Sequence, residues 1–215
     1  MTEAEAAASI LRAARRLDAL GWVPATAGNI SALLPEGRVA ITRSGFHKGF
    51  LQAEQVMVVD LDGRAEDPAL HPSAETLLHC GAYRRWPGTG AVLHGHSIAA
   101  TVLSRLAGSS LRLQGYELLK AFPGLPTHDA AVEIPVLDNS QDIPALQREV
   151  ERRWDALQDA GQPIPPGYLI RGHGVYVWGP DMDAALARLE GLEFMLACEL
   201  ATRQAGATHT GGSQA

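Results

Sequence analysis

The segment Ala91–Ser97, with the sequence AVLHGHS, ends a short apolar run with two histidines. Residues i and i+2 of a strand point to the same face, so His94 and His96 are predicted to project side by side into one space. Neutral imidazole is the commonest protein ligand for zinc, and a catalytic zinc usually has three protein ligands and one open position. The pattern therefore predicts two ligands of a metal site. The alternative is that both histidines cap the strand in an ordinary turn.

A second apolar run, in the segment Tyr168–Gly174, also ends in a histidine with glycines on both sides. This residue, His173, is the best candidate for a third metal ligand, because a catalytic site needs one more imidazole or carboxylate. The other histidines lack the paired arrangement at a strand end and are interpreted as non-ligands: His47, His71, His79, His128 and His209.

Three loops of small residues carry hydroxyl groups beside glycine or proline. They are Thr26–Ser31, Thr42–Gly45 and Pro72–Ser73. Backbone N–H and hydroxyl donors gathered at a helix N-terminus can hold a phosphate group, which makes these loops candidates for a phosphate site. Ordinary turns stabilised by Ser, Thr or Asn side chains are the alternative interpretation. None of the loops matches a P-loop or a dinucleotide-binding glycine motif.

The composition is that of an ordinary globular protein, with 46% hydrophobic and 20% charged residues among 215. The net charge of −6 provides no positive field for nucleic acid or for an anionic membrane, so neither is expected as a partner. A phosphate on a small-molecule substrate must then be held by local donors. The N-terminus is amphipathic and contains acids, unlike a signal peptide, and no apolar run is long enough to cross a membrane. A cytoplasmic location is expected.

Predicted strands and helices surround these residues. Apolar periodicity predicts strands at 39–42, 56–60, 91–97, 132–136, 168–170 and 175–178, and helices at 2–20, after 73, 98–106, after 116, 142–157 and 181–203. Several strand pairs are joined by short turns, which demands antiparallel pairing. We therefore predict one α/β domain over residues 1–204, an α/β/α sandwich with a mostly antiparallel or mixed central sheet. Residues 205–215 are small and polar and are predicted to be a disordered tail.

Five spaced segments together resemble the class II aldolase/adducin family, and the resemblance covers roughly residues 6–199. These segments are Thr26–Ser31, Thr42–Gly45, Pro72–Glu75, His94–His96 and His173–Gly174. The resemblance implies an α/β/α fold, one zinc ion per subunit and a homotetramer whose active sites lie near subunit contacts. It also implies that the substrate is a sugar phosphate.

The resemblance further implies roles for individual residues. The implied zinc ligands are His94, His96 and His173. The implied phosphate site consists of Gly28, Asn29, Ser44, Gly45 and Ser73, and Lys48 is a further candidate because its charge would help to hold a phosphate. Glu117 is implied as a catalytic acid–base residue. Glu75 occupies the position at which the aldolases of the family carry their acid–base glutamate, so it is a second catalytic candidate.

Two stretches separate the reactions that the family catalyses. Gly115–Lys120 and His173–Gly179 are more similar to the dehydratases of the family than to its sugar-phosphate aldolases. The resemblance thus implies a lyase that removes water from a ketose 1-phosphate. A zinc-dependent aldolase or epimerase is the alternative. A third hypothesis is a non-enzymatic interaction module, but such a module need not keep the three histidines.

Overall fold

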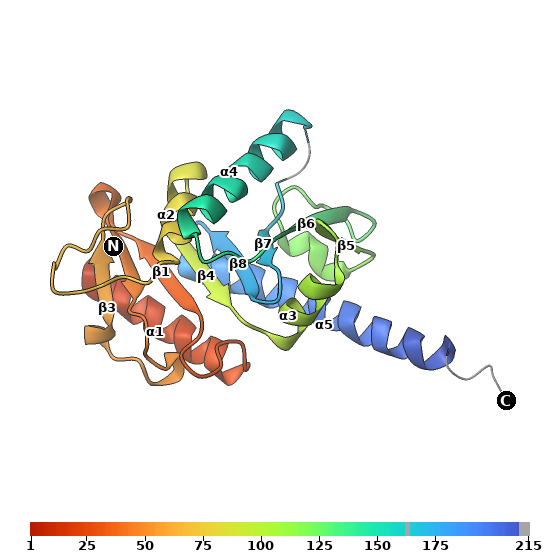
Figure 1. Ribbon diagram of the computed structural model, residues 1–215, viewed down its shortest axis with the longest axis horizontal. Helices are drawn as coiled ribbons and strands as arrows, with labels where there is room; N and C mark the ends of the chain where they lie inside the picture. Colours follow the sequence, from red (N-terminus) through yellow and green to blue (C-terminus); the bar gives the residue numbers. More distant parts are fainter. Residues whose placement is uncertain (162–163, 211–215) are drawn as a thin grey trace.

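One mixed sheet forms the centre of the computed structural model, which describes residues 1–161 and 164–210 (Figure 1). Its strands are β1 (Asn29–Leu33), β2 (Val39–Thr42), β3 (Val56–Val59), β4 (Ala91–Gly95), β5 (Ser110–Gln114), β6 (Ala131–Leu137), β7 (Gly167–Ile170) and β8 (Gly174–Gly179). They lie in the order β3-β2-β1-β4-β8-β7-β6-β5. Only β6 and β7 are parallel, and the other neighbours are antiparallel, so the predicted sheet type is confirmed.

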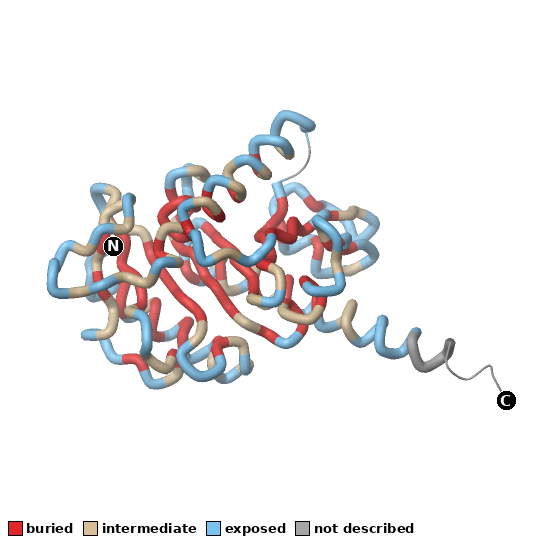
Figure 2. Tube along the Cα trace, in the orientation of Figure 1, coloured by how far each residue is buried: buried red, intermediate tan, exposed pale blue. Residues whose placement is uncertain are grey.

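Helices cover both faces of this sheet. They are α1 (Glu3–Ala19), α2 (Thr76–Arg85), α3 (Ile98–Leu106), α4 (Ile143–Asp159) and α5 (Met182–Thr210). One buried apolar cluster joins the sheet to α1, α3 and α5, and a second joins it to α2 and α4. The chain is therefore a single-domain α/β/α sandwich, as predicted, and its central strands are almost entirely buried (Figure 2).

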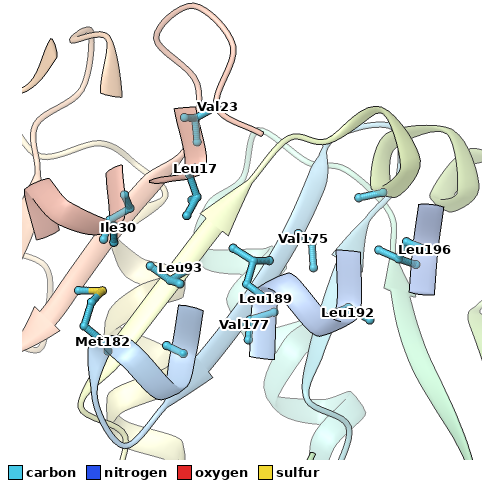
Figure 3. Packing of buried hydrophobic residues seen from close by; sticks show 14 of the residues in the cluster. Leu17, Val23, Ile30, Leu93, Val175, Val177, Met182, Leu189, Leu192 and Leu196 are labelled. Atoms are coloured by element: carbon cyan, nitrogen blue, oxygen red, sulfur yellow. The ribbon is translucent and has the colours of Figure 1, made fainter. Parts of the chain in front are cut away.

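Strand alternation decides which side chains reach each layer. Leu93 of β4 and Val177 of β8 point to the α1 and α5 side, where they pack with Leu17 and Leu189 (Figure 3). Their neighbours along the strands point the other way, so Val92 packs in the layer of α2 and α4. His94, two residues further on, shares that face with Val92. The predicted site therefore lies on the α2 and α4 side of the sheet.

Two strands were not predicted from the sequence. The first, β1, consists partly of residues that resemble a loop, because Asn29 and Ser31 are small and polar in a segment without strong β propensity. Both residues are nevertheless buried, where side-chain hydrogen bonds compensate for their polarity. The second, β5, alternates buried and exposed residues at the edge of the sheet, a pattern that indicates a half-buried strand.

The C-terminal helix α5 is longer than predicted. It continues to Thr210, beyond the predicted domain end at 204, and extends away from the body of the molecule (Figure 1). The segment after 200 contains Ala, Arg and Gln, which favour helix propagation once a helix has formed. The remaining residues of the predicted tail, 211–215, lie outside the described residues. Within the described ranges, no helix combines the length and apolar character needed to span a bilayer.

Candidate metal centre and active site

Three histidines meet where β4 ends and where β7 turns into β8. His94 is the penultimate residue of β4, His96 follows the strand, and His173 lies in the β7–β8 turn. The ring centroids are 4.4 Å apart for His94 and His96, 4.7 Å for His96 and His173, and 5.1 Å for His94 and His173. One ring nitrogen from each residue lies within 4.8 Å of the other two. The structure thus brings together the three residues that the sequence singled out.

Glycines allow the two strands to approach closely enough to form this cluster. A Cβ atom on Gly174 would lie 2.1 Å from the Gly95 carbonyl oxygen and 3.1 Å from Cε1 of His94. Gly172, on the other side of His173, has a φ of +66°, a conformation that other residues rarely adopt. The glycines that flank His173 are therefore required by the local backbone.

The His94 ring is oriented by a backbone carbonyl. Its Nδ1 lies 2.9 Å from the Val175 carbonyl oxygen, and because a carbonyl only accepts, Nδ1 carries the proton. The lone pair of Nε2 is then directed into the cluster, where this buried atom has no hydrogen-bond partner among the described residues. A carbonyl that fixes the tautomer of a histidine in this way is typical of metal ligands.

Burial keeps the imidazoles of His94 and His96 neutral. It lowers the pKa of His94 well below its usual value, and it lowers the pKa of His96 to about 4, with His173 contributing to both shifts. Metal ligands must be unprotonated, so these rings are ready to bind a cation at neutral pH. Ring nitrogens of three histidines within 4.8 Å of one another, with an unpaired buried Nε2 among them, fit a divalent metal with an open coordination position.

Glu75 places a carboxylate beside the histidines. It lies immediately before α2, with Oε1 3.1 Å from His173 Nε2 and Oε2 3.9 Å from His94 Nε2. The amide of Asn29 donates to the same Oε2. Burial alone would raise the pKa of Glu75, but the hydrogen bond from His173 and the neighbouring histidines outweigh it and lower the pKa to about 2. Glu75 is therefore a carboxylate at neutral pH.

Part of the predicted phosphate site lies directly against this cluster. Asn29 is opposite His94 in the register of β1 and β4. Gly28 has a φ of +82°, and a Cβ atom there would lie 2.9 Å from the His94 carbonyl oxygen. Ser73 Oγ accepts a 3.3 Å hydrogen bond from the Glu75 backbone N–H. These contacts connect the first and third predicted loops to Glu75 and His94.

The remaining phosphate candidates lie around the turn after β2. Ser44 is exposed, and Gly45 has a φ of +85°. Lys48 is buried, and its Nζ donates to the carbonyl oxygens of Thr26 and Phe46, at 2.8 Å each. Burial lowers the pKa of Lys48 to about 8, against the opposing effect of the Glu75 charge. Lys48 thus ties the turn after β2 to the loop before β1 and places a cation within electrostatic reach of Glu75.

Glu117 is not brought to the histidines within one chain. It begins the short helix η4 (Glu117–Ala121), and its side chain is 71% exposed. Its neighbours are Lys120, which lowers the pKa of Glu117 by a hydrogen bond, and His128, whose Nδ1 lies 4.0 Å from Glu117 Oε2. The two predicted catalytic glutamates therefore occupy different places, and only Glu75 faces the cluster in the described chain.

One contact of the site was missed by sequence analysis. The Tyr176 ring stacks on His94, with a centroid distance of 4.0 Å and an interplanar angle of 12°. The two residues are directly opposite in the register of β4 and β8. The alternation of Tyr176 and Trp178 along β8 was a signal, but its use required knowledge of which strands pair.

Together, the sandwich and its histidine cluster define an α/β/α protein with a candidate metal centre next to a carboxylate. The chain belongs to the family described as Class II Aldolase and Adducin N-terminal domain, which matches residues 8–200. The resemblance found in the sequence is confirmed.

Close relatives are named for one reaction. A protein of Gluconacetobacter diazotrophicus and one of Granulibacter bethesdensis, each named methylthioribulose-1-phosphate dehydratase, are both 57% identical to the chain. The alignments span 94% and 93% of this chain and 95% and 92% of the relatives. The greater likeness to the dehydratases of the family, predicted from two short stretches, therefore extends over nearly the whole sequence.

Solved structures of aldolases share the fold. The L-fuculose-1-phosphate aldolase of Thermus thermophilus is 27% identical, with a TM-score of 0.73 and coverage of 96% of this chain and 99% of that one. Another structure, titled L-fuculose 1-phosphate aldolase, has a TM-score of 0.78 at 19% identity and covers 96% of this chain and 90% of that one. At 19% identity, the second comparison supports the fold alone.

Proposed function

We propose that the protein is a hydro-lyase that converts 5-methylthioribulose 1-phosphate to 2,3-diketo-5-methylthiopentyl 1-phosphate, a step of methionine salvage. The proposal rests on the observation that His94, His96 and His173 lie close together beside the Glu75 carboxylate. The identity of 57% to two proteins named for this dehydratase supports the choice of substrate.

The reaction requires a proton acceptor and a proton donor near adjacent carbons. The C3 proton is removed, the C4 hydroxyl leaves with a proton as water, and the resulting enol takes up a proton at C4 to give the diketone. Zinc, the metal we propose for the three histidines, would act as a Lewis acid toward the substrate carbonyl and make C3–H more acidic. The protein must supply the groups that carry the protons.

Two carboxylates are available for this proton transfer. We propose Glu117 as the acid–base residue that serves C3 and the C4 oxygen, as the family resemblance implies. Glu75, held by Asn29, would keep a negative charge at the edge of the pocket. Because Glu117 lies apart from the histidines within one chain, its role requires a subunit contact that completes the site. The homotetramer implied by the resemblance would supply such a contact.

The phosphate group would be bound by donors from three loops. Gly28, Asn29 and Ser73 lie against Glu75 and His94, and Ser44 and Gly45 lie in the turn that Lys48 joins to Thr26. We propose that the Lys48 ammonium adds an attractive charge behind these donors. A substrate held at the phosphate would then extend its ketone toward the histidines.

A second candidate is a sugar-phosphate aldolase or epimerase. The specific observation in its favour is that Glu75, which matches the acid–base position of the aldolases, faces the cluster whereas Glu117 does not. The two candidates are separated by measuring turnover of the zinc-loaded protein with 5-methylthioribulose 1-phosphate and with L-fuculose 1-phosphate. We expect turnover of the first compound only. Turnover of the second compound alone would replace our proposal with the aldolase.

A further inference from the structure

A row of polar contacts connects α2 to β1 behind the metal centre. Glu75, His79 and Tyr83 are four residues apart, so they lie on one face of the helical segment. Asn29 and Ser31, two residues apart on β1, face them. The Asn29 amide donates to Glu75, and Ser31 Oγ lies 2.8 Å from His79 Nδ1 and 2.7 Å from the Tyr83 hydroxyl. One row therefore includes both Glu75 and a buried histidine that the reaction does not use.

This row lies in an apolar environment. His79 and Ser31 are fully buried, and Tyr83 is 8% exposed, among apolar side chains of the layer that contains α2 and α4. Buried polar groups cost free energy unless they are hydrogen-bonded, and their geometry is then narrowly defined. Such a row fixes how α2 lies on β1 more strictly than apolar contacts alone would.

The hydrogen bonds point to one tautomer of His79. Burial lowers the pKa of His79 to about 4, against the Glu75 charge, so the ring is neutral at pH 7. In one arrangement, the Tyr83 hydroxyl donates to Ser31 Oγ, and Ser31 Oγ donates to His79 Nδ1. The proton of the neutral His79 ring is then on Nε2, and among these three side chains Nε2 alone has no partner. The reverse order leaves two groups unpaired, the Tyr83 proton and the Nε2 lone pair. The first order is therefore favoured.

His79 Nε2 is one of several buried polar atoms, on α2 and on the neighbouring strand β8, that have no protein partner among the described residues. His79 Nε2, Thr76 Oγ1 and the Tyr176 hydroxyl are all buried and have no protein hydrogen-bond partner among the described residues. The His79 and Tyr176 rings are edge to face, with centroids 5.7 Å apart. Thr76 lies three residues before His79 on α2 and directly follows Glu75. Buried atoms of this kind are generally satisfied by ordered water.

We propose that His79 is a positioning residue for Glu75. Its Nδ1 holds α2 against β1 through Ser31, and its Nε2–H binds an ordered water molecule that is shared with the hydroxyls of Thr76 and Tyr176. This arrangement fixes the start of α2, and with it the carboxylate that faces the metal centre. The inference rests on the proposed function only for its kinetic readout.

The water molecule can be tested without any assay of activity. In a high-resolution crystal structure of the zinc-loaded protein, we expect an ordered water within hydrogen-bond distance of His79 Nε2 and the Tyr176 hydroxyl. We also expect the water to be lost, and the Glu75 carboxylate to shift, in the His79→Phe variant. The proposal would be overturned if the wild-type structure contains no water at this position. It would also be overturned if the Glu75 carboxylate has the same position in the His79→Phe structure.

Kinetics test the positioning role itself. His79→Phe keeps a ring but removes both nitrogens, whereas His79→Gln can offer an N–H at the end of its side chain. We expect kcat of the phenylalanine variant to fall about 10-fold, because the Glu75 charge beside the cluster is displaced, with unchanged KM and zinc content. His79→Gln should recover most of the loss. His71→Phe, at an exposed histidine, is the matched control and should leave kcat unchanged.

The kcat of each variant is compared with its melting temperature, which is measured by thermal unfolding. The proposal is contradicted if His79→Phe retains kcat, or if the glutamine and phenylalanine variants lose kcat equally at equal melting temperatures. If the wild-type protein does not dehydrate 5-methylthioribulose 1-phosphate, the proposed function fails. The crystal structures would still decide the position of Glu75 and the presence of the water.

Discussion

Nε2 of His173 lies 3.1 Å from Oε1 of Glu75, which joins the β7–β8 turn to the start of α2. A histidine of the candidate metal centre is thus also the partner of the carboxylate that faces the site. If a metal binds at His173 Nε2, this nitrogen can no longer donate a hydrogen bond to Glu75, because one nitrogen cannot do both. Metal binding at Nε2 would then release the Glu75 carboxylate from His173.

The first prediction concerns the metal ligands. Replacing His96 by alanine leaves two imidazoles at the cluster, too few for a tight catalytic zinc site, while the sheet beneath is unchanged. We expect the variant to lose both zinc and activity and to keep its fold. Elemental analysis and circular dichroism check these outcomes, with His71→Ala as the control. Full zinc content in His96→Ala would remove His96 from the ligand set.

The second prediction concerns the phosphate. Ser44 is exposed in the turn after β2, so its replacement by alanine should disturb the fold little. If Ser44 donates to the phosphate, Ser44→Ala should weaken substrate binding by about 1–3 kcal/mol, the cost of a lost hydrogen bond to a charged group. Steady-state kinetics should show this as a higher KM. Ser110→Ala, on β5 at the sheet edge, is the matched control, and an unchanged KM in Ser44→Ala would place the phosphate elsewhere.

The third prediction concerns stability and pH. Glu193 on α5 is 2% exposed and accepts a 2.5 Å hydrogen bond from Ser97, the N-cap of α3. Burial raises the pKa of Glu193 from 4.5 to about 7, although the bond from Ser97 opposes the shift. At Glu193 the folded protein therefore binds more protons than the unfolded chain between these values. The contribution of Glu193 to the free energy of unfolding should fall as pH rises through this window and level off above pH 7, opposite in sign to the contribution of the buried histidines.

Glu193→Gln isolates this contribution, because glutamine keeps the shape without the charge. The stabilisation of the variant relative to wild type should be small at pH 5, about 1 kcal/mol or less, and should grow to about 3 kcal/mol at pH 8 for a shift of this size. Urea unfolding at both pH values provides the measurement. Identical pH dependence in the two proteins would show that Glu193 does not ionise in this range.

Much of the site could be predicted from sequence because its signals are local. His94 and His96 are two residues apart, so in any strand their side chains point to the same face. The glycines beside His173 indicate a tight turn. The approach of Glu75 to His173 depends on how α2 packs against the sheet, and local pattern does not encode that packing. Asn29 and Ser31 resembled loop residues because their polarity is compensated only by α2, a distant segment.

The position of Glu117 is a second feature that could not be predicted from the sequence, for a different reason. Its assignment came from family resemblance, which carries a residue type but not the surroundings of the side chain. In the described chain it pairs with Lys120. If the protein forms the proposed homotetramer, contacts that a single chain does not contain would decide the surroundings of Glu117.

The fourth prediction compares the two glutamates. If Glu117 transfers the proton, Glu117→Gln should lower kcat about 10²- to 10⁴-fold, the usual contribution of a general acid–base group, while zinc stays bound. Glu75→Gln should have a smaller effect, because it removes only a charge beside the cluster. Near-normal turnover in Glu117→Gln together with an inactive Glu75→Gln protein would favour the second candidate function.

The fifth prediction concerns assembly. If Glu117 acts in the site of a neighbouring subunit, inactive His96→Ala and Glu117→Gln proteins should recover activity when they are mixed, unfolded and refolded together. The recovered sites would combine intact histidines of one chain with an intact Glu117 of another. Analytical ultracentrifugation should show a tetramer. A fully active monomer, or no recovery in verified mixed tetramers, would show that Glu117 does not act across a subunit contact.

The most direct test of the central claim is the mass of the product. Zinc-loaded protein is incubated with 5-methylthioribulose 1-phosphate, and the products are identified by mass spectrometry. Dehydration predicts one product that keeps every carbon and is lighter than the substrate by one water. Aldol cleavage would instead give dihydroxyacetone phosphate and a methylthio aldehyde, and their appearance would contradict the account.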